Sequence, residues 1–456
     1  MLRTASIVLL VSSCALSSTF ALKLPVGAPV GVSETDGGFI VAGSRSHRCI
    51  VMKIDEDGAI LWKASFLFPG GDPECIAALP DGGFAIAGTR NLVAGDEAYL
   101  IRAGSDGLFE WGRTAGVGVS SHGKGCIALP GGGIAVCGDV CNSTWPDGEG
   151  FVTLFSSDGA ITDSEVYDLD SYSSVLCDVS VFPGGRLALS GSEYNTISWT
   201  MLAEPDLSTI WNSAPYVGGW STTNACLAAP GGCIAICGNE GYHVYSWNFL
   251  RVFDAAGTEI VDEGFSTSPP SDVPALYDID AVESGGYCVT GLALGDCVLF
   301  RADSSGNELW RVFYTQAGAG RDVLSLDDGF MILAQHNSMD SWVIRTDENG
   351  SLPTSVTEPT ETGPSSSQLD VLIWPNPSVV SPSIEVGPGS GEVWISIFDS
   401  SGRLVSDFRI SEAGRGCRQS IPGITGANGG LPSGVYLVRA ESSQGWAEGR
   451  FVILSE

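Results

Sequence analysis

The sequence predicts an all-β protein, a seven-bladed β-propeller followed by a small C-terminal β-sandwich, on three observations. First, a cassette of roughly 45 residues recurs seven times between Gly37 and Gly350. Second, the short apolar runs within each cassette show no helical period. Third, a polar segment separates the last cassette from a tail with period-two alternation. Repetition at this length is typical of propellers, whose blades are four-stranded antiparallel sheets.

Two anchors define each cassette. The first is a Gly-rich turn that leads into a short apolar strand. It reads GGFIVAG at 37–43, GGFAIAG at 82–88, GGGIAVCG at 131–138, GGRLALSG at 184–191, GGCIAICG at 231–238, GGYCVTG at 285–291 and DGFMILA at 328–334. The second anchor is a turn followed by a strand that often carries Trp, as at Trp62, Trp111, Trp211 and Trp310. With the runs between these anchors, each cassette provides four short strands.

The seventh cassette lacks a Trp strand, because GSLPTSV at 350–356 runs directly into a linker. We therefore expect residues Leu22 to Val26 to supply the missing outer strand and to close a propeller spanning residues 22–356. Closure would hide strand edges that otherwise invite aggregation. A linear solenoid is the alternative, although its units are usually shorter or helical.

The first 21 residues, MLRTASIVLLVSSCALSSTFA, have the pattern of an export signal peptide. Arg3 precedes an apolar run, and a small-residue site follows at Thr19-Phe20-Ala21. We expect cleavage there and a mature chain outside the cytoplasm, with no transmembrane segment. The alternative is a lipoprotein signal at Val11-Ser12-Ser13-Cys14, which would place a lipid on Cys14.

A formal net charge of −31, with only four Lys, excludes a nucleic-acid partner, because phosphate backbones require concentrated positive charge. Metal cations or neutral ligands suit such a chain better. The acidic residues concentrate in the repeats rather than in the tail.

The cysteines recur at matching cassette positions. Cys126 with Cys137, and Cys226 with Cys237, have the same spacing about the same turn, so each pair could form a disulfide across a hairpin. The alternative is that these are small buried apolar residues near a crowded axis. No CxxC pair and no Cys/His cluster has zinc-ligand spacing, so we expect no metal site.

A different module follows the repeats. Residues 357–368, TEPTETGPSSSQ, have the composition of a flexible linker. Residues 369–456 alternate with period two and predict a β-sandwich of about seven strands. The tail contains the following motifs in sequence order: Pro375-Asn376-Pro377, a turn with Gly402, then Gly434 and Tyr436, and the terminal strand at 451–453.

This tail resembles the C-terminal sorting domain of bacterial type IX secretion cargo. The resemblance covers the whole tail and implies a partner, the type IX secretion machinery. It also implies passage through the outer membrane, so that the protein is secreted or attached to the outer cell surface.

The repeated Trp turn is similar to the Trp-docking repeat of pyrroloquinoline-quinone dehydrogenase propellers. The resemblance implies that each Trp packs between adjacent blades. Those enzymes have eight blades and a vicinal Cys pair that this chain lacks, so we expect no quinone and no other cofactor. The Asp residues in these turns, at Asp55, Asp303 and Asp347, predict hairpin turns rather than calcium loops.

Loop length varies only at one end of the cassettes, where strand two meets strand three and strand four meets the next cassette. These loops share one face, which is therefore the candidate binding face. Its aromatic residues could stack on sugars or anchor peptides, or could pack over blade ends. The candidates are Trp145, Trp220, Tyr242, Tyr245 and Trp247.

These features predict a binding or adhesion module with a glycan or protein ligand. The alternative is a secreted polysaccharide hydrolase or lyase that uses the same face. No catalytic residue can be assigned, because no carboxylate pair stands out among so many acids. The four histidines, at His47, His122, His243 and His336, fall in different cassettes and predict scattered surface residues.

Overall fold

A computed structural model describes the chain outside its first 18 residues, its linker and several loops. The described residues are 19–24, 26–68, 71–92, 95–116, 118, 120–141, 148–167, 174–193, 197–214, 220–242, 245–265, 275–315, 317–335, 341–352, 371–374, 383–386, 391–399, 403–413, 417–420, 433–442 and 445–453. They form an all-β structure, in which one short 3₁₀ turn, Pro230–Gly232, is the single helical element. This part of the chain contains no helix long and apolar enough to cross a membrane.

Seven antiparallel four-stranded sheets match the seven predicted cassettes. Sheet one contains β2 (Ala28–Thr35), β3 (Gly38–Ser44), β4 (Arg48–Ile54) and β5 (Ile60–Leu67). Sheet two contains β6 (Pro73–Ala78), β7 (Phe84–Leu92), β8 (Gly95–Ala103) and β9 (Phe109–Thr114). Sheet three contains β10 (Ser120–Ala128), β11 (Ile134–Cys141), β12 (Gly148–Phe155) and β13 (Ile161–Tyr167). Sheet four contains β14 (Ser174–Val181), β15 (Leu187–Glu193), β16 (Ile197–Ala203) and β17 (Thr209–Ser213).

The later sheets repeat this plan. Sheet five contains β18 (Trp220–Ala229), β19 (Cys233–Tyr242), β20 (Tyr245–Phe253) and β21 (Glu259–Glu263). Sheet six contains β22 (Ala275–Ala281), β23 (Tyr287–Ala293), β24 (Asp296–Ala302) and β25 (Glu308–Tyr314). Sheet seven contains β26 (Ala319–Leu326), β27 (Gly329–Gln335), β28 (Ser341–Asp347) and the N-terminal strand β1 (Phe20–Leu24).

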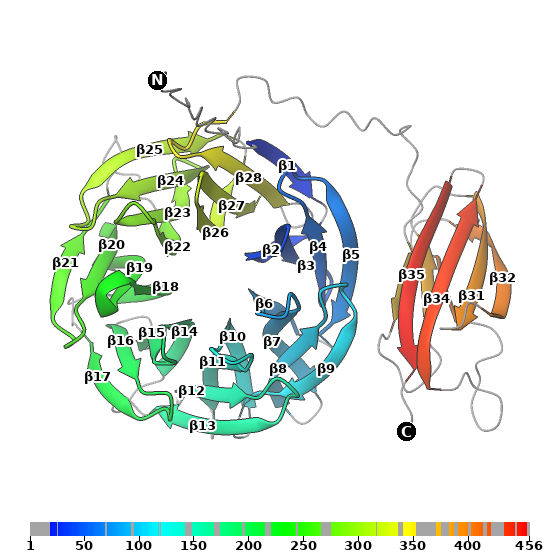
Figure 1. Cartoon of the computed structure of the whole chain (residues 1–456), viewed down its shortest axis with the longest axis horizontal. Coiled ribbons are helices and arrows are strands. Elements are labelled where there is room, and N and C mark those ends of the chain that lie inside the picture. The colour runs from blue at the N-terminus through cyan, green and yellow to red at the C-terminus, as the bar shows by residue number, and fades with distance from the viewer. Residues whose placement is uncertain are drawn as a thin grey trace, which may run out of the picture.

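The sheets follow one another around a ring, with the first strand of each sheet innermost (Figure 1). Strand β1 lies outermost in sheet seven and pairs antiparallel with β28, with Phe20 opposite Arg345. The N-terminus therefore supplies the missing outer strand, as predicted, but this strand begins at Phe20 rather than at Leu22. Hydrophobic clusters fill the space between neighbouring sheets, and one of them joins Val32 of β2 to Met331 and Leu333 of β27.

The innermost strand of every sheet carries a register irregularity at the same level. The shifts fall at Pro29/Gly31, Pro73/Cys75, Gly123/Gly125, Leu176/Asp178, Thr223/Ala225, Leu276/Asp278 and Gly320/Asp322. Each bulge inserts one residue and reverses the side-chain alternation beyond it. The bulge therefore decides which residues face the neighbouring sheet on each side.

This register corrects the disulfide hypothesis. Cys126 lies opposite Val136, whereas Cys137 lies opposite Gly125, so the two sulfurs are on opposite faces of sheet three. They accordingly belong to different hydrophobic clusters. Cys226 and Cys237 are separated in the same way, and all four are free thiols. The alternative, that they are small buried core residues, describes what the structure contains.

The Trp turns dock adjacent sheets, as the resemblance to Trp-docking propellers implied. The indole Nε1–H of Trp111 in β9 donates a hydrogen bond to the carbonyl of Ser157 in sheet three at 3.2 Å. Its ring covers Gly159, where a Cβ would lie 2.9 Å from the indole. Gly159 has φ +82°, a conformation that favours glycine. Trp111 is only 9% exposed, so it is part of the core between two sheets.

The predicted hairpin turns also carry their Asp residues as turn formers. The carboxylate of Asp303 accepts hydrogen bonds from the backbone N–H groups of Ser305 and Asn307, both at 2.9 Å. Asp55 and Asp347 accept from their own turns in the same manner. These carboxylates fix the backbone of the turn.

The tail forms two sheets from seven strands. One contains β29 (Val371–Trp374), β30 (Ser383–Val386) and β33 (Cys417–Ser420). The other contains β32 (Leu404–Ala413), β31 (Gly391–Asp399), β34 (Gly434–Ser442) and β35 (Gly445–Ile453). Their inner faces share one core, in which Ile384 packs with Ile395 and Tyr436. Gly434 opens β34, whereas Pro375, Asn376, Pro377 and Gly402 lie outside the described residues.

Candidate functional site

The candidate binding face lies at the ends of the strands where the variable loops connect them. Most residues of these loops, Trp145 among them, lie outside the described part of the chain. The described edge of sheet five carries the other predicted aromatic residues. Tyr242 and Tyr245 form the last register pair of β19 and β20. Trp220 begins β18, and Trp247 is the third residue of β20.

Trp247 is held in place by a polar network. It lies opposite Glu240 in the register of β19 and β20, and its Nε1–H donates a hydrogen bond to Oε1 of Glu240. The Trp247 side chain is nevertheless 39% exposed, so part of the ring remains open to solvent. An exposed indole with a fixed orientation can bind an apolar face of a ligand at low entropic cost.

A buried arginine supports Glu240 from below. Nη2 of Arg251 donates to Oε2 of Glu240 at 2.8 Å, and Nε donates to Asp262 at 2.9 Å. The Arg251 guanidinium also lies 4.3 Å from the ring centroid of Phe249. The Arg251 and Glu240 side chains are 4% and 7% exposed, respectively. Because both charges are removed from water, replacing either Arg251 or Glu240 with a neutral residue would leave the charge of its partner without this compensation.

Trp220 does not belong to the same platform as Trp247. It lies opposite Gly241, whereas Trp247 lies opposite Glu240, and adjacent residues of a strand point to opposite faces of the sheet. Trp220 is 37% exposed on its own side. The sequence analysis placed both Trp residues on one candidate face, but in the structure they lie on opposite faces of sheet five.

A second polar group on this face joins sheets two and three. Nδ1 of His122 in β10 lies 2.7 Å from Oδ2 of Asp139, and its Nε2 lies 3.2 Å from Oδ2 of Asp96 in β8. The hydrogen bond with Asp139 raises the pKa of His122, and the bond with Asp96 adds to this, against a partial burial that lowers it. The imidazole is therefore stabilised in its protonated form.

Sequence reasoning missed this group because it treated the histidines as scattered. Asp139 directly follows Gly138, the last residue of the Gly-anchored motif, and His122 lies opposite Asp139 in the register. An acidic residue within two positions after the strand-ending Gly is the signal that could have drawn attention to this edge. Asp139 stands one residue after Gly138, and Glu240 stands two residues after Gly238.

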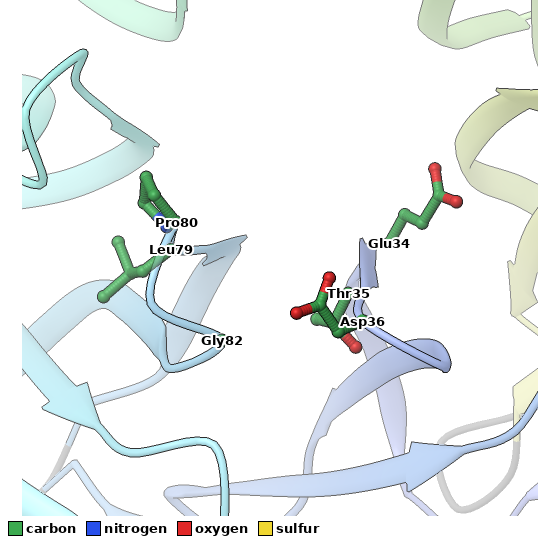
Figure 2. A pocket seen from close by; sticks show the side chains of 6 residues that line it. All are labelled: Glu34, Thr35, Asp36, Leu79, Pro80 and Gly82. Carbon is green, nitrogen blue, oxygen red and sulfur yellow. The ribbon is translucent and has the colours of Figure 1, made fainter.

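A shallow hollow of about 310 Å³ opens on the other face of the ring, where the tight turns lie. Figure 2 shows Glu34 and Thr35 from the end of β2 and Asp36 from the turn after it on one side, and Leu79 and Pro80 from the turn after β6 on the other. Gly82 completes the lining. This hollow is separate from the aromatic edge, because the two lie at opposite ends of the innermost strands.

Among the described residues, no group of three or more His, Cys, Asp or Glu side chains is arranged to hold a metal ion. Burial raises the pKa of the Cys226 and Cys237 thiols. A buried thiol with a raised pKa is unreactive.

Comparison with known proteins gives structural likenesses only. No family model and no curated protein matches the chain. PorZ, described as a bacterial surface component of the type IX secretion system of Porphyromonas gingivalis, matches 94% of the chain at 14% identity and a TM-score of 0.44. The match spans 59% of the length of the PorZ chain.

Two further structures match part of the chain. A polysaccharide lyase, Uly1, matches 71% of this chain and 91% of its own at 8% identity, with a TM-score of 0.47. A protein of unknown function from Bacteroides caccae matches 60% of this chain and 93% of its own at 12% identity, with a TM-score of 0.41. Likenesses at this level do not assign an activity to the chain.

Proposed function

We propose that this chain is an exported, closed seven-bladed β-propeller that binds a neutral glycan through its variable-loop face. In this proposal residues 22–356 contain the propeller, 357–368 the linker and 369–456 a sorting domain that engages the type IX secretion machinery. The protein acts as a binding or adhesion module, secreted or attached to the outer cell surface.

Support for closure comes from contacts between the start of the chain and its last propeller sheet. Strand β1 pairs with β28, and the carboxylate of Asp322 in β26 accepts a hydrogen bond from the backbone N–H of Val32 in β2 at 2.7 Å. Both contacts join residues about 300 positions apart in the sequence. A closed ring leaves few strand edges exposed.

The observation that carries the binding proposal is the fixed, half-exposed Trp247. Its indole nitrogen is bonded to Glu240, so the ring presents a face of constant orientation at the edge where the variable loops meet. Tyr245 and Tyr242 lie in the same hairpin, two and five positions before Trp247 in the sequence. Sugar rings offer apolar C–H faces to such aromatic surfaces, and their hydroxyl groups can bond to nearby carboxylates.

The charge favours a neutral ligand. With a formal net charge of −31, the chain would repel anionic polysaccharides as they approach and so slow their association. A neutral glycan avoids this repulsion and still gains from aromatic stacking.

The sorting role of the tail rests on its motifs. Gly434 begins a central strand, and Tyr436, which follows two residues later, is 4% exposed in the core shared by both sheets. The Tyr side chain therefore stabilises the sandwich, and recognition by the machinery falls to exposed residues. Export of a carrier protein fused to residues 369–456, compared with the same carrier without it, tests this role in a host with type IX secretion.

A glycan array probed with the full chain tests the binding proposal. Trp247→Ala should weaken capture of the bound glycan by about fivefold, because an aromatic contact of this kind contributes on the order of 1 kcal/mol. Trp394→Ala is the matched control, since Trp394 is an exposed Trp of the tail that is 51% exposed. Unchanged binding by the Trp247 variant, with the wild-type unfolding midpoint, would refute the proposal.

A polysaccharide hydrolase or lyase is the second candidate, and one observation favours it. His122 lies between Asp139 and Asp96 and is 32% exposed, so it can reach a ligand and exchange a proton with it. The test is an assay of new reducing ends with the full chain and two sets of polysaccharides, neutral ones for a hydrolase and uronic-acid ones for a lyase. Turnover that His122→Gln abolishes would favour catalysis over simple binding.

A further inference from the structure

Docking of adjacent sheets repeats with the same geometry at three interfaces. Trp62 donates from Nε1 to the carbonyl of Ser105, and Trp211 donates to the carbonyl of Ala255, at 3.2 and 3.1 Å. Each ring covers a turn Gly two residues further on, where a Cβ would lie 3.1 Å from Trp62 at Gly107 and 2.7 Å from Trp211 at Gly257. Trp111 makes the same pair of contacts. Each Trp thus makes two contacts with the next sheet: its ring packs on a turn glycine, and its indole N–H donates a hydrogen bond to a backbone carbonyl.

The interface between sheets seven and one has no Trp in its outer strand. The ring of Phe20 takes the place of the indole, because a Cβ at Gly58 would lie 3.2 Å from three of its ring atoms. The phenyl side chain of Phe20 has no N–H group that could replace the indole donor. Arg345, which lies opposite Phe20 in β28, donates from Nη1 to the carbonyl of Glu56 at 2.9 Å.

Glu56 stands two residues before Gly58, the same position that Ser105 has before Gly107. The phenyl ring of Phe20 and the guanidinium of Arg345 therefore divide between them the two contacts that one Trp makes elsewhere. Arg345 is 7% exposed, so this contact is shielded from water. Phe20 is thus the docking aromatic of the seventh interface.

We propose that the mature chain retains Phe20, and that the export leader is removed by hydrolysis of one peptide bond between Ser13 and Phe20. Cleavage after Ala21, which the small-residue site predicts, would remove Phe20 and Ala21. It would delete two of the five register pairs of β1 with β28 and leave Gly58 uncovered. This inference concerns processing and does not depend on ligand binding.

The sequence offers suitable bonds in this interval. Small residues stand at Ala15, Ser17 and Ser18, and a lipoprotein signal would cut before Cys14. Every one of these sites leaves Phe20 in the mature protein. Water adds across the cleaved amide bond in each case, so the products are the free leader and a new α-amino terminus.

The direct test is N-terminal sequencing with intact-mass measurement of the full chain after export by a host with its own leader peptidase. We expect a terminus at one of the residues from Cys14 to Phe20. A terminus at Cys14 with added lipid mass also supports the proposal, because Phe20 remains. A terminus at Leu22 overturns it.

A stability measurement tests the role of Phe20 independently. Two chains that run from Ser18 and from Leu22 to the C-terminus are compared by thermal unfolding. Phe20→Ala and Phe20→Trp are made in the chain that begins at Ser18. We expect the Leu22 start and Phe20→Ala to lower the midpoint by several degrees, and Phe20→Trp to keep it. Equal midpoints for the Ser18 and Leu22 chains would overturn the proposed docking role.

Discussion

The carboxylate of Asp322 accepts a hydrogen bond from the backbone N–H of Val32 at 2.7 Å, joining the innermost strands of sheets seven and one. Asp278 accepts from Val323 at 2.7 Å between sheets six and seven, in the same relation. Asp178 accepts from Cys226 at 2.8 Å between sheets four and five. Each Asp is the residue directly after the bulge, so the bulge aims a carboxylate at the next sheet.

We expect Asp322→Ala to lower the free energy of unfolding by about 1–3 kcal/mol, because the buried N–H of Val32 would lose its acceptor. Asp322→Asn should cost less, since the amide oxygen can still accept. Urea unfolding of both variants measures the difference. Equal stability of Asp322→Ala and the wild type would show that the bond contributes nothing to the interface.

Asp178 and a second buried carboxylate of the innermost strands, Asp280, predict a pH dependence; Asp280 accepts a hydrogen bond from the backbone N–H of Ser325 at 2.8 Å. Burial raises the pKa of Asp178 to about 7 and that of Asp280 to about 6, from an ordinary value near 3.8. Because the folded state holds these protons more tightly than the unfolded chain, their contribution to stability is complete below about pH 4 and is lost as the pH rises to about 7. The unfolding free energy should therefore decline across this range.

Asp178→Asn isolates this effect. The variant keeps an acceptor for Cys226 but has no proton to lose, so its stability should decline less steeply between about pH 4 and 7 than that of the wild type. Denaturant unfolding at several pH values gives the two slopes. A variant slope as steep as the wild-type slope would contradict the assignment to Asp178.

Sequence periodicity was sufficient to predict the seven sheets, because the Gly turns and apolar strands are local features that recur at fixed spacing. The docking role of Trp111 could also be predicted, from the turn that accompanies it. The bulges could not, since residues such as Lys124 and Tyr277 at the inserted positions share no side-chain chemistry. The faces of Cys126 and Cys137 depend on that one inserted residue.

The Asp residues that follow the bulges can be recognised in the sequence only once the strand register is known. Asp178 stands at the same distance before Pro183 as Cys75 does before Pro80, so the two residues occupy equivalent positions in their cassettes. On the candidate binding face, Trp247 and Tyr242 could be named from loop position alone. The support of Trp247 by Glu240 and Arg251 could not, because it requires the register in which β19 pairs with β20.

Trp111→Ala should destabilise the fold by about 3–5 kcal/mol, since it removes a large buried ring between two sheets and leaves a cavity. Trp247→Ala serves as the comparison, because that ring is partly exposed at the rim and its loss should cost much less. Chemical unfolding measures both. Similar losses for the two variants would mean that docking does not distinguish the two sites.

Gly159→Ala tests the same interface from its other side. Its φ of +82° strains any residue with a Cβ, and that Cβ would lie 2.9 Å from the Trp111 ring. We expect a loss of about 1–3 kcal/mol. Gly131→Ala is the matched control, since Gly131 also has a positive φ but open space around it. A larger loss at Gly131 would contradict the docking contact.

The cysteine assignment predicts a thiol count. Cys126 and Cys137 lie on opposite faces of sheet three, so Cys126→Ser should lower the number of titratable thiols by one under denaturing, non-reducing conditions. If the two residues formed a disulfide, the same substitution would release Cys137 and raise the count by one.

Amide hydrogen exchange of the full chain tests closure of the ring most directly. The strand Ser341–Asp347 lies between β27 and β1, whereas Glu308–Tyr314 is the free outer edge of sheet six. A closed ring predicts slow exchange throughout 341–347 and at Val32, and faster exchange at alternate amides of 308–314. Exchange in 341–347 as fast as in 308–314 would show that the N-terminal strand does not close the ring.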